Sequence, residues 1–334
     1  MRKRIVLFSL AFALSFYVFA GFATAKPFYE GKTIKLIVGY KPGGGWDFYG
    51  RLMAKFMQRY LPGSTIIVKN IPGAGSIIGC NELYHAKPDG LTIGNFNRAL
   101  TISQLVGIKG VKFDLAKMSL LGSACSELYT FTVSSKFKNF NEVKKAKTVK
   151  LATAGVGGMN YVTASLIEYI MDLKNFRLIT GYSGGETGLA IKRGETDGSF
   201  HSFGSVSTWI EEGFAHPVLF IGQKQPKGYE NVPLLQNIVT ENKYKPLVDL
   251  LVGINTIGRP FGGPPGIKPD RLTALQDAFK KACYDPELLE LAEKTQRPIE
   301  YMNAEKAKEW VEKILSIPPN QVTLIKKAYG EGEQ

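Results

Sequence analysis

The stretch Ile34–Asp47, IKLIVGYKPGGGWD, decides the fold that we expect for this chain. Its apolar first half has the length and composition of a buried β-strand, and the sequence from Arg51 to Tyr60 favours a helix. Between them, glycines allow the chain to turn sharply where the helix begins. The first N–H groups of a helix lack partners within the helix and lie at the positive end of its dipole. The stretch therefore predicts a seat for an anion.

Three further stretches repeat this order of strand, glycine turn and helix. They are Thr65–Gly79 (TIIVKNIPGAGSIIG), Val149–Asn160 (VKLATAGVGGMN) and Phe176–Gly185 (FRLITGYSGG). Ligands of open α/β sheets bind beyond the carboxyl ends of the strands, so four such turns, two per lobe, can converge on one cleft. Glycines also make tight turns where no ligand binds. Four turns in the same context nevertheless favour a site for a carboxylate or phosphate.

The N-terminus predicts export from the cytoplasm. Basic residues Arg2–Arg4 precede the apolar run Ile5–Phe22, and Ala23–Ala25 has the small-x-small form of a cleavage site. We expect residues 1–25 to be a signal peptide whose removal releases a periplasmic protein. An uncleaved anchor is the alternative, because the apolar run is close to the shortest length of a membrane span. The first cysteine is Cys80, so no cysteine at the cleavage site can carry a lipid.

Composition argues against several kinds of partner. The net charge is +13 over 334 residues and falls to +10 when residues 1–25 are removed. The lysines are dispersed, and their densest group, at 136–150, has few aromatic neighbours, so we expect no nucleic-acid groove. The three histidines and three cysteines show no ligand spacing, so we expect no metal and no cofactor. We expect a monomer, and whether two of the cysteines pair stays open.

The order of elements predicts an α/β protein with two lobes. Helical stretches alternate with short apolar strands, which are typical of largely parallel sheets. The expected strands lie near 34–40, 65–69, 91–95, 149–154, 176–181, 197–200 and 218–222. A strand-like return at 249–257 and a helical tail from Pro269, with Asp270 as its N-cap, would follow. The tail helices are expected near 270–283, 286–296, 304–315 and 320–329.

This order implies a first lobe that is discontinuous in sequence. We expect residues 26–127 and 255–334 to form lobe 1 and residues 128–254 to form lobe 2. Two crossovers, near 125–130 and 250–256, would join the lobes and allow them to close around a ligand.

Several motifs resemble one known family. Pro42–Asp47 with Arg51 is similar to the P-G-G-x-x-D-x-x-x-R opening of the periplasmic substrate-binding proteins of tripartite tricarboxylate transporters. Asn70–Gly75 (NIPGAG), Ile78-Gly79 and Pro88–Thr92 (PDGLT) match the family's N-x-P-G-A-G, I-G and P-D-G-x-T signatures in order. The resemblance covers essentially all of the chain after residue 25 and is strongest before residue 95.

The resemblance implies a periplasmic binding protein (type II) fold with a ligand cleft between the lobes. It implies a receptor, not an enzyme, that captures a small organic carboxylate and delivers it to integral membrane transporter subunits. Backbone amides of the glycine turns would hold the carboxylate. The implied ligand-binding residues are Gly44, Gly45, Trp46, Asp47, Gly73, Ala74, Gly75, Gly157, Gly158, Met159, Tyr182, Ser183 and Gly184, with Asp197 near the hinge side of the cleft. Replacing Ala74 by valine should then push the ligand away from the second turn.

The chain departs from the family at two turns. It has Gly155–Tyr161 where the family commonly has G-x-G-S-x-x-H, and Gly181–Gly184 where the family has P-Y-K-G. A serine, a histidine and a lysine side chain are missing there, which puts the identity of the ligand in doubt. The ring of Trp46 either forms a floor for an apolar part of the ligand or packs against the other lobe.

Two other functions share parts of this sequence pattern. Gly181–Gly185 satisfies the G-x-S-x-G pattern of a serine hydrolase, but the last histidine, His216, follows Ser183 by only 33 residues. That spacing is too short for the remaining strands, the acid and the histidine of that fold. A solute-sensing component that docks on a membrane histidine kinase shares every feature of a transport receptor and stays open.

Overall fold

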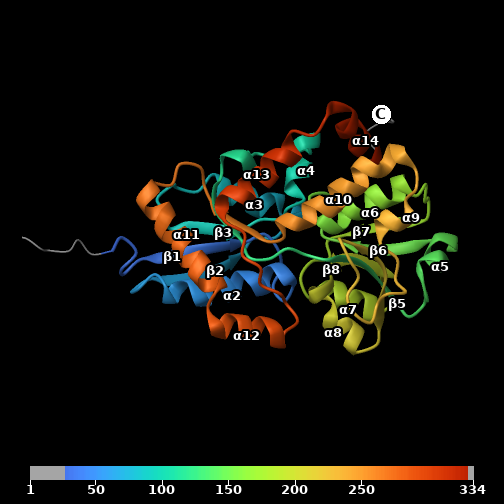
Figure 1. The fold of residues 1–334 in the computed structure, drawn as a ribbon, viewed down its shortest axis with the longest axis horizontal. Coiled ribbons are helices and arrows are strands. Elements are labelled where there is room, and N and C mark those ends of the chain that lie inside the picture. Colours follow the sequence, from blue (N-terminus) through green and yellow to red (C-terminus); the bar gives the residue numbers. More distant parts are fainter. Residues whose placement is uncertain (1–26, 330–334) are drawn as a thin grey trace, which may run out of the picture.

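The computed structural model describes residues 27–329, so the predicted signal peptide at 1–25 lies outside the described residues. Within residues 27–329 the strands form two five-stranded sheets, one in each half of the molecule (Figure 1). The first sheet has the order β2 (Thr65–Asn70), β1 (Thr33–Val38), β3 (Thr92–Asn95), β10 (Pro260–Gly263) and β4 (Ser119–Ser123). β1 pairs in parallel with β2 and β3, and β10 pairs antiparallel with both of its neighbours.

The second sheet repeats this plan. Its order is β7 (Phe176–Thr180), β6 (Val149–Thr153), β8 (Gly198–Ser202), β5 (Tyr129–Ser134) and β9 (Ala215–Ile221). β6 is parallel to β7 and β8, and β5 is antiparallel to β8 and β9. In each sheet the three parallel strands therefore end at the same edge. The glycine turns that follow β1 and β2 lie at this edge of the first sheet, and those that follow β6 and β7 lie at this edge of the second.

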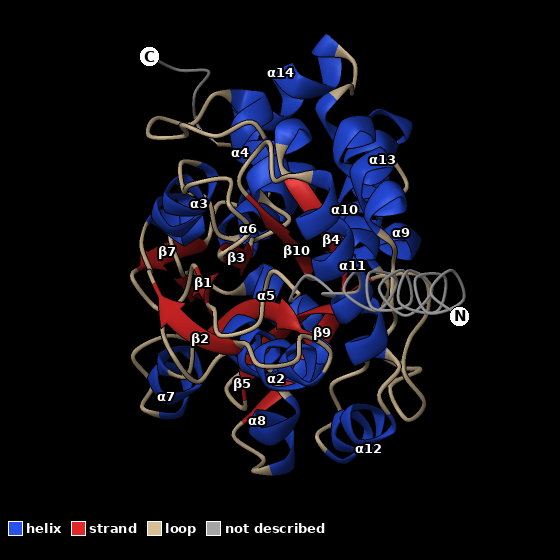
Figure 2. Ribbon diagram, turned by 90° about the vertical axis from the view of Figure 1, so that its left-hand side faces the viewer, coloured by secondary structure: helices blue, strands red, loops and turns tan. Residues whose placement is uncertain are grey.

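Helices surround both sheets (Figure 2). The described helices are α2 (Gly45–Arg59), α3 (Ile77–Tyr84), α4 (Leu100–Val106), α5 (Phe140–Lys145), α6 (Met159–Ile170), α7 (Glu186–Lys192), α8 (Ser207–Glu211), α9 (Leu235–Ile238), α10 (Lys245–Ile257), α11 (Pro269–Cys283), α12 (Pro286–Lys294), α13 (Ala304–Leu315) and α14 (Pro319–Ala328). Short 3-10 turns are η1 (Ala74–Ser76), η2 (Leu115–Lys117), η3 (Phe203–Ser205) and η4 (Asn242–Tyr244).

The helices pack on the sheets through two buried apolar clusters. On the first sheet, α2 and α11 share one cluster, while α3, α4 and α13 belong to the other. The second cluster continues through α10 onto α6 and the second sheet, so the two halves share buried apolar contacts.

The chain crosses between the sheets twice, once after β4 and once after α10. Residues 124–128 lead from β4 to β5, and residues 258–259 lead from α10 to β10. The lobe boundaries expected above stay a proposal, which limited proteolysis would test.

The strand-like return predicted at 249–257 is wrong. That segment belongs to α10, in which Leu247, Leu251 and Ile254 recur at helical spacing and are fully buried. The return strand is β10, whose sequence Pro-Phe-Gly-Gly has little β propensity and is held by pairing on both sides. The strands predicted elsewhere all occur, within three residues, but β4 and β5 were missed.

The helical tail is confirmed as α11–α14. Its first N-cap is Lys268, with Pro269 at the first helical position, so Asp270 lies in the first turn and is not the cap. α13 packs on β4 and α10, and α14 packs on α6 as well as on α4 (Figure 1). The last helix therefore contacts the second half of the molecule, across the boundary expected for the tail.

Candidate functional site

The first glycine turn ends in an uncapped helix N-terminus. α2 begins at Gly45, and its N-cap residue Gly44 is extended, with φ −97° and ψ 176°, and makes no side-chain cap. The N–H groups of the first turn therefore lack acceptors within the helix and present partial positive charge. Gly44, Gly45 and Trp46 line a cavity between the two sheets. The turn that the sequence predicted as an anion seat therefore faces this cavity.

Asp47 holds this turn in shape. Its carboxylate accepts hydrogen bonds from Gly43 N at 3.1 Å and Asn70 Nδ2 at 2.8 Å, and it lies 3.0 Å from Arg51 Nε. Burial by itself would raise the pKa of Asp47, but the hydrogen bonds from Arg51 and Asn70 outweigh burial and lower it. Asp47 lies outside the lining of the cavity in the described chain. Asp47 therefore positions the turn, and the spacing of four residues allows its ion pair with Arg51 on α2. Its contact with a ligand stays a prediction.

The cavity takes its other wall from the second half of the chain. Met159, Tyr182, Ser183 and Gly184, all expected from sequence, line it. Its volume is about 110 Å³. This is well below the ~300 Å³ of the smallest drug-sized sites. The cavity as formed therefore suits a compact ligand.

The turns of the two halves touch each other directly. Gly185 N donates to Pro42 O at 3.3 Å, and Lys41 N donates to Ser183 Oγ at 3.4 Å. Lys41 Nζ also lies 2.8 Å from Glu186 Oε2. These bonds join backbone on one side of the cavity to the facing turn on the other. The structure is therefore a closed arrangement of the two halves.

The second turn meets the third turn and does not line the cavity. Gly75 N donates to Ala154 O at 3.1 Å, across the boundary between the sheets. Asn97 Nδ2 donates to Gly157 O at 2.8 Å, and Gly157–Gly158 pack against the turn Gly73–Gly75. In the described chain, the predicted ligand-binding residues Gly73–Gly75 therefore contact Gly157 and Gly158, and none of them lines the cavity.

Asp197 lies far from the position expected for it. Its carboxylate accepts from Lys136 Nζ at 2.9 Å and from Lys150 N at 2.8 Å. Lys150 is at the start of β6, and β8, which follows Asp197, is parallel to β6. Asp197 therefore lies at the amino ends of these strands, opposite the glycine turns. The prediction that it lies near the cleft is wrong.

Ser183 has no hydrogen-bonded catalytic partner among the described residues. Its Oγ accepts the backbone N–H of Lys41, and within residues 27–329 no hydrogen bond joins it to a histidine. His201 lines the same cavity, but its Nε2 has no hydrogen-bond partner in the described chain. A serine nucleophile needs a base within hydrogen-bond reach that a third group orients. The G-x-S-x-G pattern is thus a turn that closes the cavity.

The sequence reading missed the charged side chains of the site. Arg98, Arg259 and Arg297 line the cavity, whereas no aspartate or glutamate of the described residues does. Behind the lining, Glu127 pairs with both Arg98 (Nη1, 3.1 Å) and Arg259 (Nε, 2.6 Å), and these three side chains are at most 5% exposed. No local pattern marks these arginines, because they come from distant segments that only the fold brings together.

Arg259 also changes the titration of its neighbours. Burial, and then the charge of Arg259, lower the pKa of His201 to about 4. The same two causes, in the same order, lower the pKa of Arg297. Among the described residues, three arginines line the cavity and the carboxylate of Glu127 pairs with two of them.

The ring of Trp46 is already covered by protein groups. Tyr40 stacks on it, with ring centroids 5.8 Å apart, and the Arg259 guanidinium lies 4.6 Å from its centre. Tyr40 follows β1 and Arg259 precedes β10, so these contacts come from the same half of the molecule as Trp46. They are not the packing against the other lobe that was one of the two interpretations.

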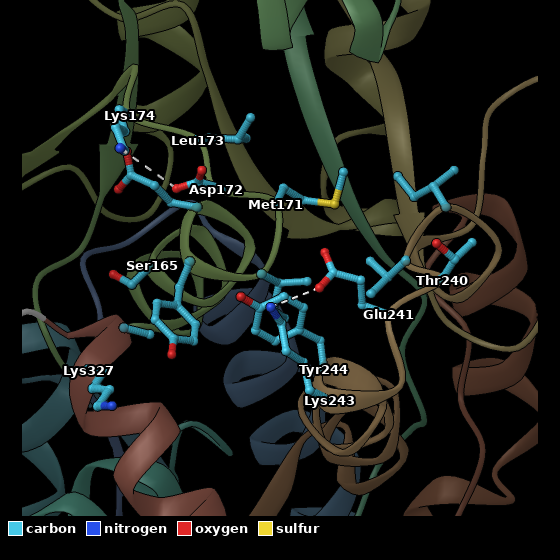
Figure 3. Close-up of a pocket in the computed structure, with 16 residues that line it drawn as sticks. Ser165, Met171, Asp172, Leu173, Lys174, Thr240, Glu241, Lys243, Tyr244 and Lys327 are labelled. Atoms are coloured by element: carbon cyan, nitrogen blue, oxygen red, sulfur yellow. Dashed lines mark ion pairs between the residues drawn. The ribbon is translucent and has the colours of Figure 1, made fainter.

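A larger groove of about 960 Å³ lies elsewhere, between α6, α14 and residues 238–244 (Figure 3). Its charged groups are largely paired with each other: Lys243 lies 2.8 Å from Glu241, and Lys174 lies 3.9 Å from Asp172. No glycine turn of the described chain reaches this groove. The smaller cavity between the turns is therefore the better candidate for anion binding.

Residues 27–329 contain no group of His, Cys, Asp and Glu side chains that could hold a metal. Cys80, Cys125 and Cys283 are buried and unpaired in this part of the chain. Among the described helices, none is long and apolar enough to cross a membrane.

Comparison with known proteins gives a consistent result. Residues 50–318 match the model of the tripartite tricarboxylate transporter family receptor. A protein of Cupriavidus necator, described as a UPF0065 protein in the gbd 5' region, is 26% identical over 285 residues, which are 82% of this chain and 81% of that protein. The structure of the periplasmic binding protein BugD has a TM-score of 0.75 at 20% identity and covers 90% of this chain and 99% of its own. MatC from Rhodopseudomonas palustris with bound malate has a TM-score of 0.73 at 17% identity and covers 88% and 99%. The fold is thus that of the two-lobed periplasmic binding proteins.

Proposed function

The chain belongs to the tripartite tricarboxylate transporter receptor family, and on this premise we propose that it is an extracytoplasmic solute receptor for a small organic carboxylate. It would capture the acid between its lobes and deliver it to the integral membrane subunits of a tripartite tricarboxylate-type transporter. It would do so as a monomer, without a cofactor and without chemical change of the ligand.

The cavity between the glycine turns carries this proposal. It combines the open N-terminus of α2 with three arginines and contains no lining carboxylate of the described chain. Such a site stabilises an anion and repels a cation. That MatC was solved with malate agrees with a carboxylate ligand for this fold.

The cellular location is part of the proposal. The basic N-terminus, apolar run and Ala23–Ala25 predict that the mature protein starts at Lys26 in the periplasm. Intact-mass analysis of the periplasmic fraction tests this. Full-length protein retained in the membrane fraction would contradict it.

A thermal-shift and calorimetry screen tests ligand binding. A ligand that binds only the folded state raises the melting temperature by mass action. We expect one or more organic acids to do so, and neutral sugars and amines to have no effect. If sugars or amines bind and no acid does, the proposed function is wrong.

A further inference from the structure

Six exposed cations gather at one end of the second sheet. At the start of β6, Lys150 lies in register with Arg177 of the neighbouring strand β7. Asn175, just before β7, donates from Nδ2 to Val143 O at 2.8 Å and to Ala146 O at 2.9 Å, so the end of α5 lies beside the same edge. Figure 1 shows α5 at the right-hand end of the molecule. We call this surface the basic tip, and its members are Lys138, Lys144, Lys145, Lys147, Lys150 and Arg177.

Four acids near the basic tip are already engaged. They are Glu142, Glu168, Asp172 and Asp197. Asp197 pairs with Lys136 at 2.9 Å and Asp172 with Lys174 at 3.9 Å, while the two glutamates accept backbone N–H groups. Within residues 27–329, no member of the basic tip forms an ion pair. The basic tip therefore presents excess positive charge to the solvent.

Stability of the fold explains only part of this arrangement. Two of the lysines lie in the last turn of α5, where the helix dipole stabilises cations. Lys138 and Lys147 lie outside α5. Lys150 and Arg177 are like charges on strands about 4.8 Å apart, so they repel each other unless an anion lies beside them. The basic tip is therefore better suited to contact with an anionic partner than to the free protein.

The basic tip lies too far from the cavity to draw ligands into it. It is at the amino end of β6, whereas the glycine turn follows the carboxyl end of this strand of five residues. At about 3.3 Å per residue, the strand separates the two by about 16 Å. Charges are screened over about 8 Å at physiological ionic strength. The excess charge therefore serves a contact at the tip itself.

The chemistry of the basic tip favours phospholipid headgroups over nucleic acid or protein. Phe137 and Phe140, which lie among these lysines, are at most 5% exposed, so their rings cannot stack on bases. Five of the six cations are lysines, whose compact charges suit a mobile layer of phosphates. Arginine, with its fixed fork of donors, suits a carboxylate held in one place. The partner is therefore recognised by its charge and not by a fixed geometry.

We propose that the basic tip docks the protein on the anionic phospholipid headgroups of a membrane surface. Each lysine close to such a surface adds to the attraction. The inference rests on the proposed function, because a receptor that delivers its ligand to membrane subunits has to reach that surface. Since the glycine turns lie at the opposite edge of the sheet, docking at the tip leaves the cavity uncovered.

Sedimentation with lipid vesicles tests the docking surface in the absence of ligand. We expect the protein purified from the periplasm to bind vesicles that contain phosphatidylglycerol and not vesicles of phosphatidylcholine alone. This binding should weaken as salt is added, because salt screens exposed charges. In the variant Lys138→Gln/Lys147→Gln/Lys150→Gln, each lost charge should weaken the partitioning about fivefold, which amounts to about 100-fold for the three together.

A second variant controls for net charge. Lys109→Gln/Lys268→Gln/Lys281→Gln removes the same charge from exposed lysines of the first half, which form no ion pair among the described residues. It should keep the vesicle binding of the wild type, and circular dichroism should show that both variants are folded. Both should also keep the affinity for the acid, because neither changes the lining of the cavity.

Three results would overturn the lipid docking surface. They are no binding of the wild type to phosphatidylglycerol vesicles, equal binding to phosphatidylcholine vesicles, and equal loss in the two variants. If the wild type binds no vesicles but the first variant still lowers solute uptake by cells, the basic tip contacts an acidic protein instead. The acid screen contains no vesicles and the sedimentation assay contains no ligand, so failure of the docking surface is distinct from failure of the proposed function.

Discussion

Adding one methyl group at Gly44 should prevent the two lobes from closing while leaving each of them folded. Gly44 has φ −97°, which any L-residue adopts, so alanine is compatible with the turn itself. In the closed arrangement, however, the new Cβ would lie 2.6 Å from Gly184 Cα on the facing turn. The atom it meets is backbone, which cannot move aside as a flexible side chain can. The cost therefore appears in the closed form.

The size of the effect follows from this overlap. Ordinary contact of a Cβ begins at 3.4 Å, so the turns must separate by the difference, 0.8 Å. Overpacking of this kind costs about 1–3 kcal/mol, which corresponds to about 5- to 150-fold weaker ligand binding. Alanine is also a poorer N-cap than glycine, so the unliganded protein should lose no more than about 1 kcal/mol of stability.

Gly185→Ala is the matched control in the facing turn. Its φ is −70°, and its Cβ would have Gly43 O as its nearest neighbour, at 3.8 Å. We expect its ligand affinity to stay within about threefold of wild type, because no contact is compressed. Calorimetry with the best acid from the screen gives the affinities, and small-angle scattering shows whether the ligand still compacts the protein.

Two results would refute this reasoning. One is wild-type affinity and compaction in Gly44→Ala, which would mean that the liganded state does not bring these turns together. The other is equal weakening in Gly185→Ala, which would mean that any methyl group in these turns disturbs the site. Ala74→Val, the change suggested by sequence, is a poorer probe because Ala74 is exposed with φ +47°, where valine is strained.

Three further predictions concern single side chains. Asp47→Ala should lower the free energy of unfolding by about 1–3 kcal/mol and weaken acid binding, because Gly43 N and Arg51 lose their acceptor; urea denaturation with unchanged stability would contradict this. Ser183→Ala removes one hydrogen bond to Lys41, so calorimetry should show at most about tenfold weaker binding of the acid. A hundredfold loss of affinity, or an esterase activity of the wild type that disappears in this variant, would argue for a larger role of Ser183. The pKa of His201 lies at about 4 in the fold against an ordinary 6.5, so between these pH values the unfolded chain binds more protons and stability falls as pH falls. In His201→Gln, the free energy of unfolding should fall less between pH 7 and pH 4 than in the wild type, by a difference of no more than about 3 kcal/mol. Denaturation curves at several pH values measure this, and the same pH dependence in both proteins would count against a buried neutral imidazole.

The local parts of the site could be predicted from the sequence because they depend on neighbouring residues. Pro42–Asp47 and Phe176–Gly185 became turns between a strand and a helix. Six of the residues that line the cavity on these turns were predicted: Gly44, Gly45, Trp46, Tyr182, Ser183 and Gly184. The sequence did not separate glycine turns that line the cavity from glycine turns that contact each other. Gly73–Gly75 has the same glycine-rich form, yet it docks on the third turn outside the cavity.

The remaining features depend on positions that meet only in three dimensions. The apolar pattern of residues 249–257 fits a strand as well as a helix, and the packing of α10 against α13 and α6 selects the helix. The family resemblance implied a position for Asp197 near the cleft, whereas the parallel pairing of β6 and β8 puts it at the opposite ends of these strands.

The sequence by itself determined most of the strands, the glycine turns and the family, because these follow from propensities and spacings within a few residues. Only the tertiary structure decided which turns face each other, and that Arg98, Arg259 and Arg297 gather around a cavity with the carboxylate of Glu127 behind it. A buried arginine carries no mark in a linear sequence, since its burial is created by elements far along the chain. The positive charge around this cavity is therefore a property of the fold.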